Sequence, residues 1–148
     1  MKLQDILAVK GSMVHSISPD TTLQEVVQTL VERRIGSLVV CQSDAEGRVT
    51  LKGIITERDI LHASLREKRP LAEVRVSEAM TTALVTGLPD DEVEQVMGLM
   101  TTRRIRHLPV LADGQLVGMI SIGDVVKAQH DSLALENRFM KDYISNPR

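Results

Sequence analysis

The spacing of hydrophobic residues predicts the same amphipathic helix twice along the chain. Over residues 23–31, apolar side chains recur every three or four positions, which gives a helix one buried face. The helix is expected to begin after Thr22, because Glu25 three positions later can complete a capping box. Residues 90–104 repeat the pattern in the second half of the chain. We therefore expect two helices with equivalent buried faces.

Each predicted helix is followed by two short aliphatic runs that favour β-strands. They span residues 37–41 and 49–55 in the first half, and 107–111 and 116–120 in the second. Turn-forming residues separate the two runs of each pair, so each pair is expected to form a hairpin. With one short strand before and a second helix after, each half is predicted to fold as strand, helix, strand, strand, helix.

The two hairpins end in the same motif. The first copy is Gly53-Ile54-Ile55-Thr56-Glu57-Arg58-Asp59 and the second is Gly118-Met119-Ile120-Ser121-Ile122-Gly123-Asp124. Upstream residues correspond at an offset of 70, whereas the motif corresponds at 65, so the first hairpin carries five extra residues (70 − 65). An insertion confined to one connection is typical of two folded copies of one unit that differ in a surface loop.

The repeated motif also predicts a chemistry. Gly53 and Gly118 lack side chains, so a flat ligand can approach the strand backbone there. The Thr or Ser then offers a hydroxyl and free N–H groups at a helix start, which favours phosphate. Asp59 and Asp124 follow one helical turn later, where a carboxylate can accept hydrogen bonds from the ribose 2′,3′-diol.

A second interpretation of the motif needs no ligand. The Thr and Ser would be helix caps, and each aspartate would complement the helix dipole. Capping alone does not require aspartate at the same position twice, so we favour ligand binding while the capping interpretation stays open.

Composition limits the classes of function. At 148 residues and 43% hydrophobic content, the chain can form one compact domain or two half-domains that share a core. Aromatic residues make up 1%, so platforms for stacking single-stranded nucleic acid are nearly absent. Lys and Arg number 18 against 20 Asp and Glu, a formal charge of −2, which gives no overall attraction to nucleic acid or anionic membranes. Nucleic acid and membrane are therefore not expected partners.

No catalytic or metal-binding constellation stands out. The chain has no Gly-x-Ser-x-Gly elbow, Walker loop or Gly-x-Gly-x-x-Gly motif, so we expect a protein that is not an enzyme and has no catalytic cofactor. His15, His62 and His130 lack a second ligand at metal spacing. The single Cys41 excludes an internal disulfide, and no 18-residue apolar run or signal-type N-terminus is present. The cytoplasm is the expected compartment.

A basic run lies between the second helix and the following strand. Arg103 and Arg104 end the predicted helix, where cations complement the C-terminal dipole, as Arg33 does in the first half. Arg106 and His107 lie beyond the helix, at the strand entrance, and we predict that they bind an anion.

These residues together resemble a known family. The two hairpin motifs, the helix start Ser18-Pro19-Asp20-Thr21-Thr22-Leu23 and the run Arg103-Arg104-Ile105-Arg106-His107-Leu108-Pro109-Val110 are similar to a tandem pair of cystathionine-β-synthase (CBS) domains, a Bateman module. The resemblance covers roughly residues 14–127 and extends to small stand-alone bacterial CBS proteins. It implies an α/β fold (α+β in some schemes) of two β-α-β-β-α repeats with pseudo-two-fold symmetry and short terminal helices.

The expected domain organisation follows from this resemblance. It comprises an N-terminal helix (1–13), a first CBS repeat (14–66), a linker (67–79), a second CBS repeat (80–130) and a C-terminal helix (131–148). Both terminal helices carry apolar stripes that can pack on their own domain or on a second chain. CBS pairs commonly form a flat dimer, so the resemblance favours a homodimer.

The family resemblance also implies ligands and their binding residues. CBS pairs bind adenosine compounds such as AMP, ADP, ATP, NAD and S-adenosylmethionine in two clefts between the repeats. In one cleft, Ser121 and Asp124 would bind the ribose, with Ser16 and the backbone near Ile35 and Gly36 around the adenine. In the other, the corresponding residues would be Thr56, Asp59, Thr86, Ile105 and Arg106.

Phosphate binding is expected to differ between the two clefts. The family often has basic residues before the Leu-Pro-Val strand, and here these are Arg106 and His107, whereas the first repeat has Gly36 and Ser37. The cleft near Arg106 and His107 is therefore the better phosphate site, while Arg58 can assist the other.

The resemblance implies an energy or redox-state sensor that acts through a homodimer, with or without an unidentified regulated partner. Two alternatives remain at this stage. One is a constitutive dimerisation scaffold with degenerate pockets, and the other is a nucleic-acid-binding protein that uses the basic run.

Overall fold

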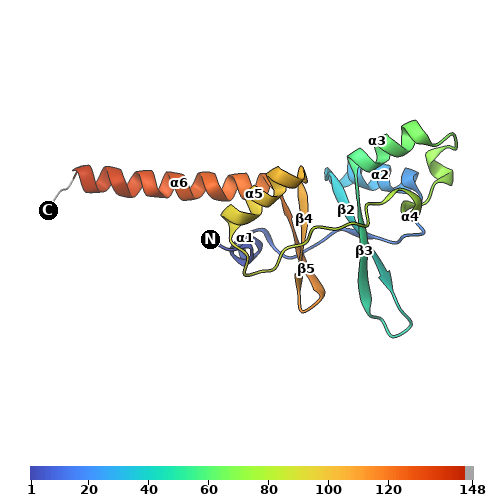
Figure 1. Ribbon diagram of the computed structural model, residues 1–148, viewed down its shortest axis with the longest axis horizontal. Helices are drawn as coiled ribbons and strands as arrows, with labels where there is room; N and C mark the ends of the chain where they lie inside the picture. Colours follow the sequence, from blue (N-terminus) through green and yellow to red (C-terminus); the bar gives the residue numbers. More distant parts are fainter. Residues whose placement is uncertain (146–148) are drawn as a thin grey trace. The chain divides into compact units, whose positions relative to one another are not determined.

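The computed structural model describes residues 1–145, which form an α+β fold (Figure 1). The elements of the first half are α1 (Leu3–Lys10), β1 (Ser16–Ile17), α2 (Leu23–Arg33), β2 (Ser37–Ser43), β3 (Val49–Thr56) and α3 (Glu57–Arg66). The elements of the second half are the 3₁₀ turn η1 (Leu71–Glu73), α4 (Val76–Ala79), α5 (Val93–Arg103), β4 (His107–Ala112), β5 (Gln115–Ser121) and α6 (Ile122–Ser145).

The chain divides into two compact units, one for each repeat. The first-repeat unit consists of Met13–Val85 and Asp113–Leu116. The second-repeat unit consists of Met1–Ser12, Thr86–Ala112 and the chain from Val117 onward. The N-terminal segment therefore belongs to the unit of the second repeat, although it precedes the first repeat in the sequence.

The first-repeat unit has the predicted order of elements. Its sheet has the strand order β1-β2-β3, with β1 parallel and β3 antiparallel to β2. Helices α2 and α3 bury their apolar side chains against the sheet, and this core includes Leu23, Leu30, Leu38, Ile55 and Ile60. The predicted β2–β3 hairpin and the Thr22–Glu25 capping box are confirmed.

The second-repeat unit departs from the predicted order at its first strand. Strands β4 and β5 form a two-stranded sheet, and the expected preceding strand is reduced to a single parallel bridge between Gly87 and Val110. Gly87 stands where the first repeat has Ile17, and glycine is a poor strand former. Leu108 and Leu3 pack closely over Gly87, so a larger side chain would not fit there.

The apolar face predicted for the first helix is wider than the face that is buried. Leu23, Val26 and Leu30 of α2 are buried, but Val31 is 71% exposed. In the second repeat Met100 of α5 is buried, whereas Met97 on the same apolar face is only partly covered. Part of the α2 face thus remains available for another contact.

Each repeat is completed by a short segment that lies outside its own stretch from long helix to motif. We call residues 1–10 the N-terminal strap and residues 74–82 the central strap. The N–H of Leu23 donates to Val74 O (2.8 Å), and the equivalent N–H of Val93 donates to Met1 O (2.9 Å). In return, Val76 N donates to Thr21 O (2.8 Å) and Leu3 N donates to Asp91 O (3.0 Å). Each strap therefore forms the same backbone bonds with the start of a long helix.

The side chains of the two straps repeat this equivalence at an offset of 73 residues (74 − 1). Leu3 and Val76 are both fully buried. The ion pair Lys2–Asp90 corresponds to Arg75–Asp20. Leu7 packs on Gly118 as Met80 packs on Gly53. The N-terminal strap lies within the segment expected as a separate helix (1–13), and the central strap covers the end of the expected linker (67–79) and the first residues of the expected second repeat (80–130). The two straps are thus equivalent structural parts of the two units.

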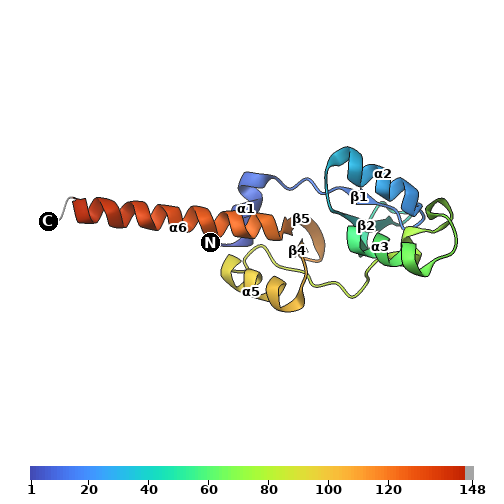
Figure 2. The same cartoon turned by 90° about the horizontal axis from the view of Figure 1, so that it is seen from above.

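The expected short C-terminal helix does not begin separately. Helix α6 runs without a break from Ile122 to Ser145, through the boundary expected at residue 131 (Figure 2). Residues 146–148 of that predicted segment lie outside the described residues. Within its own unit, α6 packs against α5 near its start, and its later part extends beyond the rest of that unit.

The close packing at the motif glycines predicts the effect of substituting them. A Cβ at Gly53 would lie 2.7 Å from the backbone Thr81 O, whereas a Cβ at Gly118 would meet only the movable end of Leu7. Gly53→Ala should therefore lower the free energy of unfolding by about 1–3 kcal/mol, and by more than Gly118→Ala does. Urea unfolding measures both changes.

Gly98→Ala is the matched control, because a Cβ there meets nothing within 4 Å inside helix α5. It should stabilise the protein by roughly 0.5–1 kcal/mol. A Gly53→Ala variant as stable as the parent would show that the central strap is free to move away from β3.

Candidate functional site

Both repeated motifs form the junction between a hairpin strand and a helix. Thr56 ends β3 and caps α3, and its hydroxyl accepts a hydrogen bond from Asp59 N (3.4 Å). Asp59 Oδ2 accepts in return from Thr56 N (2.9 Å). In the second repeat, Asp124 N donates to Ser121 Oγ (3.1 Å) and Ser121 N donates to Asp124 Oδ2 (2.8 Å).

These reciprocal bonds are capping boxes with aspartate in the acidic position. Both aspartates thus take part in capping, and the capping interpretation accounts for a carboxylate at this position in each copy. It does not account for aspartate in particular, because the Thr22 box of the same chain uses Glu25. A ligand would have to use the acceptor capacity that the caps leave.

The loop before each inner strand contacts the motif of its own repeat. Glu57 N donates to Gly36 O (3.3 Å), and Ile122 N donates to Arg106 O (2.8 Å). Gly36 and Arg106 correspond at the offset of 70, and Glu57 and Ile122 at the offset of 65. The structure thus places these loops beside Thr56 and Ser121 respectively.

The remaining predicted binding residues lie on the edges of these junctions. Ser16 is exposed on β1 opposite Val39, and Thr86 is exposed beside the Gly87 bridge. Ile35 and Ile105 each follow an arginine in the left-handed conformation, Arg34 and Arg104 (φ 54° in both). The predicted clefts combine residues of both units, so their assembly remains a prediction.

Asp59 has a further partner that the sequence did not reveal. Thr81 of the central strap donates its hydroxyl to Asp59 Oδ1 (2.9 Å), while Thr56 donates both N–H and O–H to Oδ2. Thr81 also forms an antiparallel backbone bridge with Ile54 of β3. The carboxylate of Asp59 is therefore held by a neutral hydroxyl from the strap.

Asp124 has a charged partner in the equivalent place. Lys10 of the N-terminal strap donates from Nζ to Asp124 Oδ2 (2.7 Å) and to Met119 O (2.7 Å). Met119 corresponds to Ile54, whose carbonyl accepts a hydrogen bond from Thr81 N in the first repeat. Lys10 Nζ therefore bonds to the equivalent carbonyl of the second repeat. Burial opposes ionisation of Asp124, but the hydrogen bonds from Lys10 and Ser121 outweigh it and lower the pKa of this carboxyl.

The predicted phosphate-binding residues lie at the surface near these junctions. Arg58 is exposed in the first turn of α3, and Arg106 is exposed just before β4. His107 begins β4 and is partly covered. Arg103 lies in the last turn of α5, as expected for a cation that complements the helix dipole.

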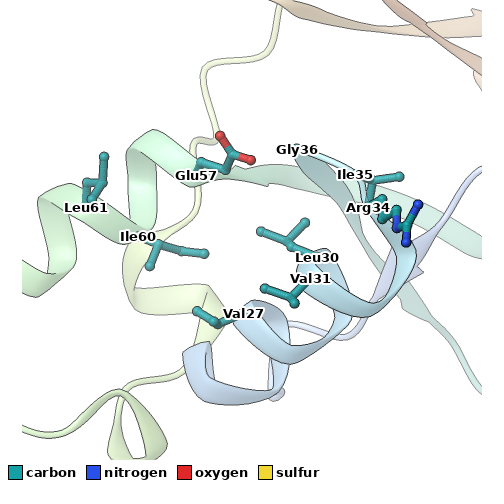
Figure 3. Close-up of a pocket in the computed structure, with 9 residues that line it drawn as sticks. All are labelled: Val27, Leu30, Val31, Arg34, Ile35, Gly36, Glu57, Ile60 and Leu61. Carbon is teal, nitrogen blue, oxygen red and sulfur yellow. The ribbon is translucent and has the colours of Figure 1, made fainter.

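The first-repeat unit also carries an apolar groove of about 580 Å³ between α2 and α3. In Figure 3, Leu30 and Val31 of α2 lie on one side and Ile60 of α3 on the other. Ile35 and Gly36 line its end, but the groove has mainly aliphatic walls. The sequence signal for this groove was the presence of apolar side chains beyond the buried face of each helix, namely Val27 and Val31 on α2 and Leu61 on α3.

Other candidate chemistry is sparse in the described part of the chain. Burial raises the pKa of the Cys41 thiol, which disfavours the reactive thiolate at neutral pH. Among residues 1–145, no group of three His, Cys, Asp or Glu side chains can hold a metal ion. Over the same residues, no helix is both long and apolar enough to cross a membrane.

Known proteins with similar sequences share this organisation. A protein of Arabidopsis thaliana, the mitochondrial CBS domain-containing protein CBSX3, is 36% identical over 132 residues, which cover 85% of this chain and 63% of CBSX3. The chain thus spans less than two thirds of that relative. The CBS domain-containing protein YhcV of Bacillus subtilis is 33% identical over 125 residues, which cover 82% of this chain and 85% of YhcV.

Solved structures match the fold. The CBS-domain containing protein ATU1752 of Agrobacterium tumefaciens superposes with a TM-score of 0.78 at 40% identity, covering 87% of this chain and 99% of that one. The CBS domain pair of protein MJ0100, solved with 5′-methylthioadenosine and S-adenosyl-L-methionine, has a TM-score of 0.70 over 89% of this chain and 98% of its own. At 24% identity, this second likeness shows the fold alone.

The family profile of the CBS domain matches the chain twice, over residues 9–66 and 76–131. The two matches follow the two units with their β-hairpins, long helices and capped motifs. The chain therefore belongs to the CBS domain family and is a tandem pair of these regulatory domains.

Proposed function

We propose that this CBS pair is a non-catalytic sensor that binds adenosine-containing ligands, AMP, ADP, ATP or NAD, and acts through a homodimer. The observation that carries the proposal is the repeated junction, in which a hairpin strand ends at a hydroxyl residue and Asp59 or Asp124 lies in the first turn of the following helix. A carboxylate there can accept from a ribose diol, while the helix start favours a nearby phosphate. The adenosine derivatives bound by MJ0100 show that this fold can accommodate such ligands.

The phosphate end of the ligand would distinguish the two sites. Arg106 and His107 precede β4, whereas Gly36 and Ser37 occupy the equivalent positions before β2. Arg106 is exposed, and its backbone carbonyl accepts a hydrogen bond from Ile122 N, so the backbone of this loop is held at the start of α6 while the guanidinium stays accessible to an anion. A phosphorylated ligand should therefore favour contacts with this loop.

Ligand binding would regulate the protein only if two states of the module differ in affinity. The straps are suitable elements, because Lys10 and Thr81 contact the very aspartates that would bind ribose. A ligand that reorganises either aspartate changes the hydrogen bonds to a strap, which is the segment that leads into the other repeat. This supports a sensor over a scaffold with degenerate pockets.

The later part of α6 is the best-supported dimerisation surface. Leu133, Leu135, Phe139, Met140, Tyr143 and Ile144 are between 52% and 74% exposed. They share the helix face that carries the buried Val125 near the start of α6. An apolar face that continues beyond its own unit is suited to pairing with the same face of a second copy.

The first prediction concerns the ribose contact. Asp124→Ala should weaken binding of the adenine nucleotide by roughly 10- to 150-fold, the loss of a charged hydrogen bond of about 1.5–3 kcal/mol. Calorimetric titration with AMP, ATP and NAD measures this, after mass spectrometry of the gently denatured protein has identified any ligand retained on purification. Asp131→Ala, an exposed aspartate of the same helix, is the control. Equal affinity in parent and Asp124→Ala would exclude Asp124 from the site.

The second prediction separates phosphate binding from adenosine binding. Arg106→Ala should weaken AMP binding and leave adenosine nearly unaffected, because only AMP loses a charge-assisted contact. AMP affinity should also fall more steeply with salt than adenosine affinity. An equal loss for both ligands would mean that Arg106 shapes the pocket and does not bind phosphate.

The third prediction concerns the homodimer. Phe139→Asp should shift the protein toward the 16.4 kDa monomer, because a carboxylate on the apolar face cannot be buried against a second copy. Ala134→Asp adds the same charge on the opposite, polar face of α6, beside Arg138 and Lys141, and should leave the assembly unchanged. Light scattering after gel filtration measures the mass. A monomeric parent protein would contradict the dimer.

A further inference from the structure

The two aspartates differ in the hydrogen-bonding capacity that they leave for a ligand. A carboxylate offers about four acceptor positions, two on each oxygen. Among the described residues, Asp124 Oδ2 accepts from Ser121 N and Lys10 Nζ, and the Ser121 hydroxyl also helps to lower the pKa of this carboxyl, whereas no hydrogen bond reaches Oδ1. Its Oδ1 therefore retains two acceptor positions on one atom.

Asp59 is more fully occupied. Its Oδ2 accepts from Thr56 N (2.9 Å) and Thr56 Oγ1 (3.1 Å), and its Oδ1 accepts from Thr81 Oγ1 (2.9 Å). Only one acceptor position then remains. A ribose diol donates two hydrogen bonds. The Asp59 carboxylate can therefore accept only one of them while the Thr81 hydroxyl remains bonded to Oδ1.

The difference originates in the straps. Helix α1 continues for eight residues to Lys10 before Gly11 (φ 98°) ends it, whereas α4 ends after four residues at Ala79. The central strap can therefore extend and pair its backbone with Ile54, which brings the Thr81 hydroxyl to Asp59. The helical N-terminal strap has no such bridge, and it reaches the equivalent carbonyl of Met119 with the Lys10 side chain.

We propose that the two motifs bind ribose unequally: Asp124 accepts both hydroxyls of the diol, whereas Thr81 restricts Asp59 to one. Lys10 is a positioning residue, which holds Asp124 by Oδ2 and leaves Oδ1 for the ligand. Thr81 is a specificity-determining residue of the other site. This inference rests on the proposed binding of adenosine ligands and adds which motif recognises the intact ribose.

The test compares adenosine with 2′-deoxyadenosine in variants that keep one aspartate. In Asp59→Ala, where Asp124 remains, adenosine should bind at least about 10-fold more tightly than 2′-deoxyadenosine. In Asp124→Ala, where Asp59 remains, the two affinities should agree within about 3-fold. Because alanine also removes a cap, Asp→Asn variants of both residues provide a second pair, and circular dichroism checks that each variant folds.

Thr81→Val tests the cause of the difference. Combined with Asp124→Ala, it should free Oδ1 of Asp59 and raise the preference for adenosine over 2′-deoxyadenosine to about 10-fold. Thr82→Val, at the exposed neighbouring position, should leave that preference unchanged. Equal preferences at both aspartates, or the same effect from Thr82→Val, would overturn the inference.

Lys10→Met tests the positioning role with a readout that does not depend on ligand. The pKa of Asp124 should rise in this variant, as measured by carboxyl NMR titration, because the lysine hydrogen bond lowers it. A lowered folded-state pKa stabilises the protein above the unfolded-state value of about 3.9, and this stabilisation is lost as the pH falls through the folded-state pKa. Lys10→Met should therefore lose more stability relative to the parent at pH 7 than at low pH, where only the loss of the Lys10 bond to Met119 O remains.

The outcomes separate this inference from the proposed function. If adenosine, AMP and ATP all fail to bind the parent protein at millimolar concentration, the proposed function is wrong. If they bind but the preference for ribose is the same at both aspartates, only the unequal assignment is wrong. An unchanged Asp124 pKa in Lys10→Met would remove Lys10 from its positioning role.

Discussion

The backbone pairing between each strap and the start of a long helix is the interaction on which the rest of the structure depends. Leu23 and Val93 begin their helices by donating to Val74 O and Met1 O. These bonds satisfy N–H groups that a helix cannot satisfy itself. They also place the buried Leu3 and Val76 side chains in the two units. The central strap follows directly in the main stretch of the first-repeat unit, whereas the second-repeat unit takes its strap from the distant N-terminus of the chain.

The packing of the two straps explains the form of the candidate site. Both straps pass the motif glycines. At Gly53 the backbone Thr81 O leaves no space for a side chain, whereas at Gly118 the contact is the movable end of Leu7. Packing within the protein thus requires glycine at Gly53 and favours it at Gly118, which is a role apart from the close ligand approach inferred from the sequence. Beyond the glycine, each strap reaches the motif aspartate through Lys10 or Thr81.

Local patterns predicted most elements, because the helices and hairpins depend on short-range periodicity and capping. The capping box at Thr22 and the β2–β3 hairpin are examples in which neighbouring residues determine the structure. The equivalence of the two straps was not recognised from the sequence. Both have the same order of residue types, which is apolar, basic, apolar, polar, acidic, apolar, apolar, in Met1-Lys2-Leu3-Gln4-Asp5-Ile6-Leu7 and Val74-Arg75-Val76-Ser77-Glu78-Ala79-Met80. Both segments lie outside the helix-to-motif repeat, so only their pairing with distant helix starts reveals their role.

The candidate site shows the same limit. The positions of Thr56, Asp59, Ser121 and Asp124 could be inferred from their repetition, but their capping bonds and strap partners could not. Lys10 is 114 residues from Asp124, and Thr81 is 22 residues from Asp59. No local pattern distinguishes either residue from an ordinary surface side chain.

The covalent path of the straps offers a route from a ligand to the other half of the molecule. Lys10 holds Asp124 and lies six residues before Ser16, which begins β1 of the first-repeat unit. Thr81 holds Asp59 and lies six residues before Gly87, which bridges to Val110 in the second-repeat unit. In the proposed sensor, a ligand that changes the hydrogen bonds of one aspartate therefore acts on a segment that leads into β1 or to the bridged residue Gly87 of the other unit. Chain connectivity thus supplies a physical route for the proposed regulation, because each motif is hydrogen-bonded to the segment that leads into the other repeat.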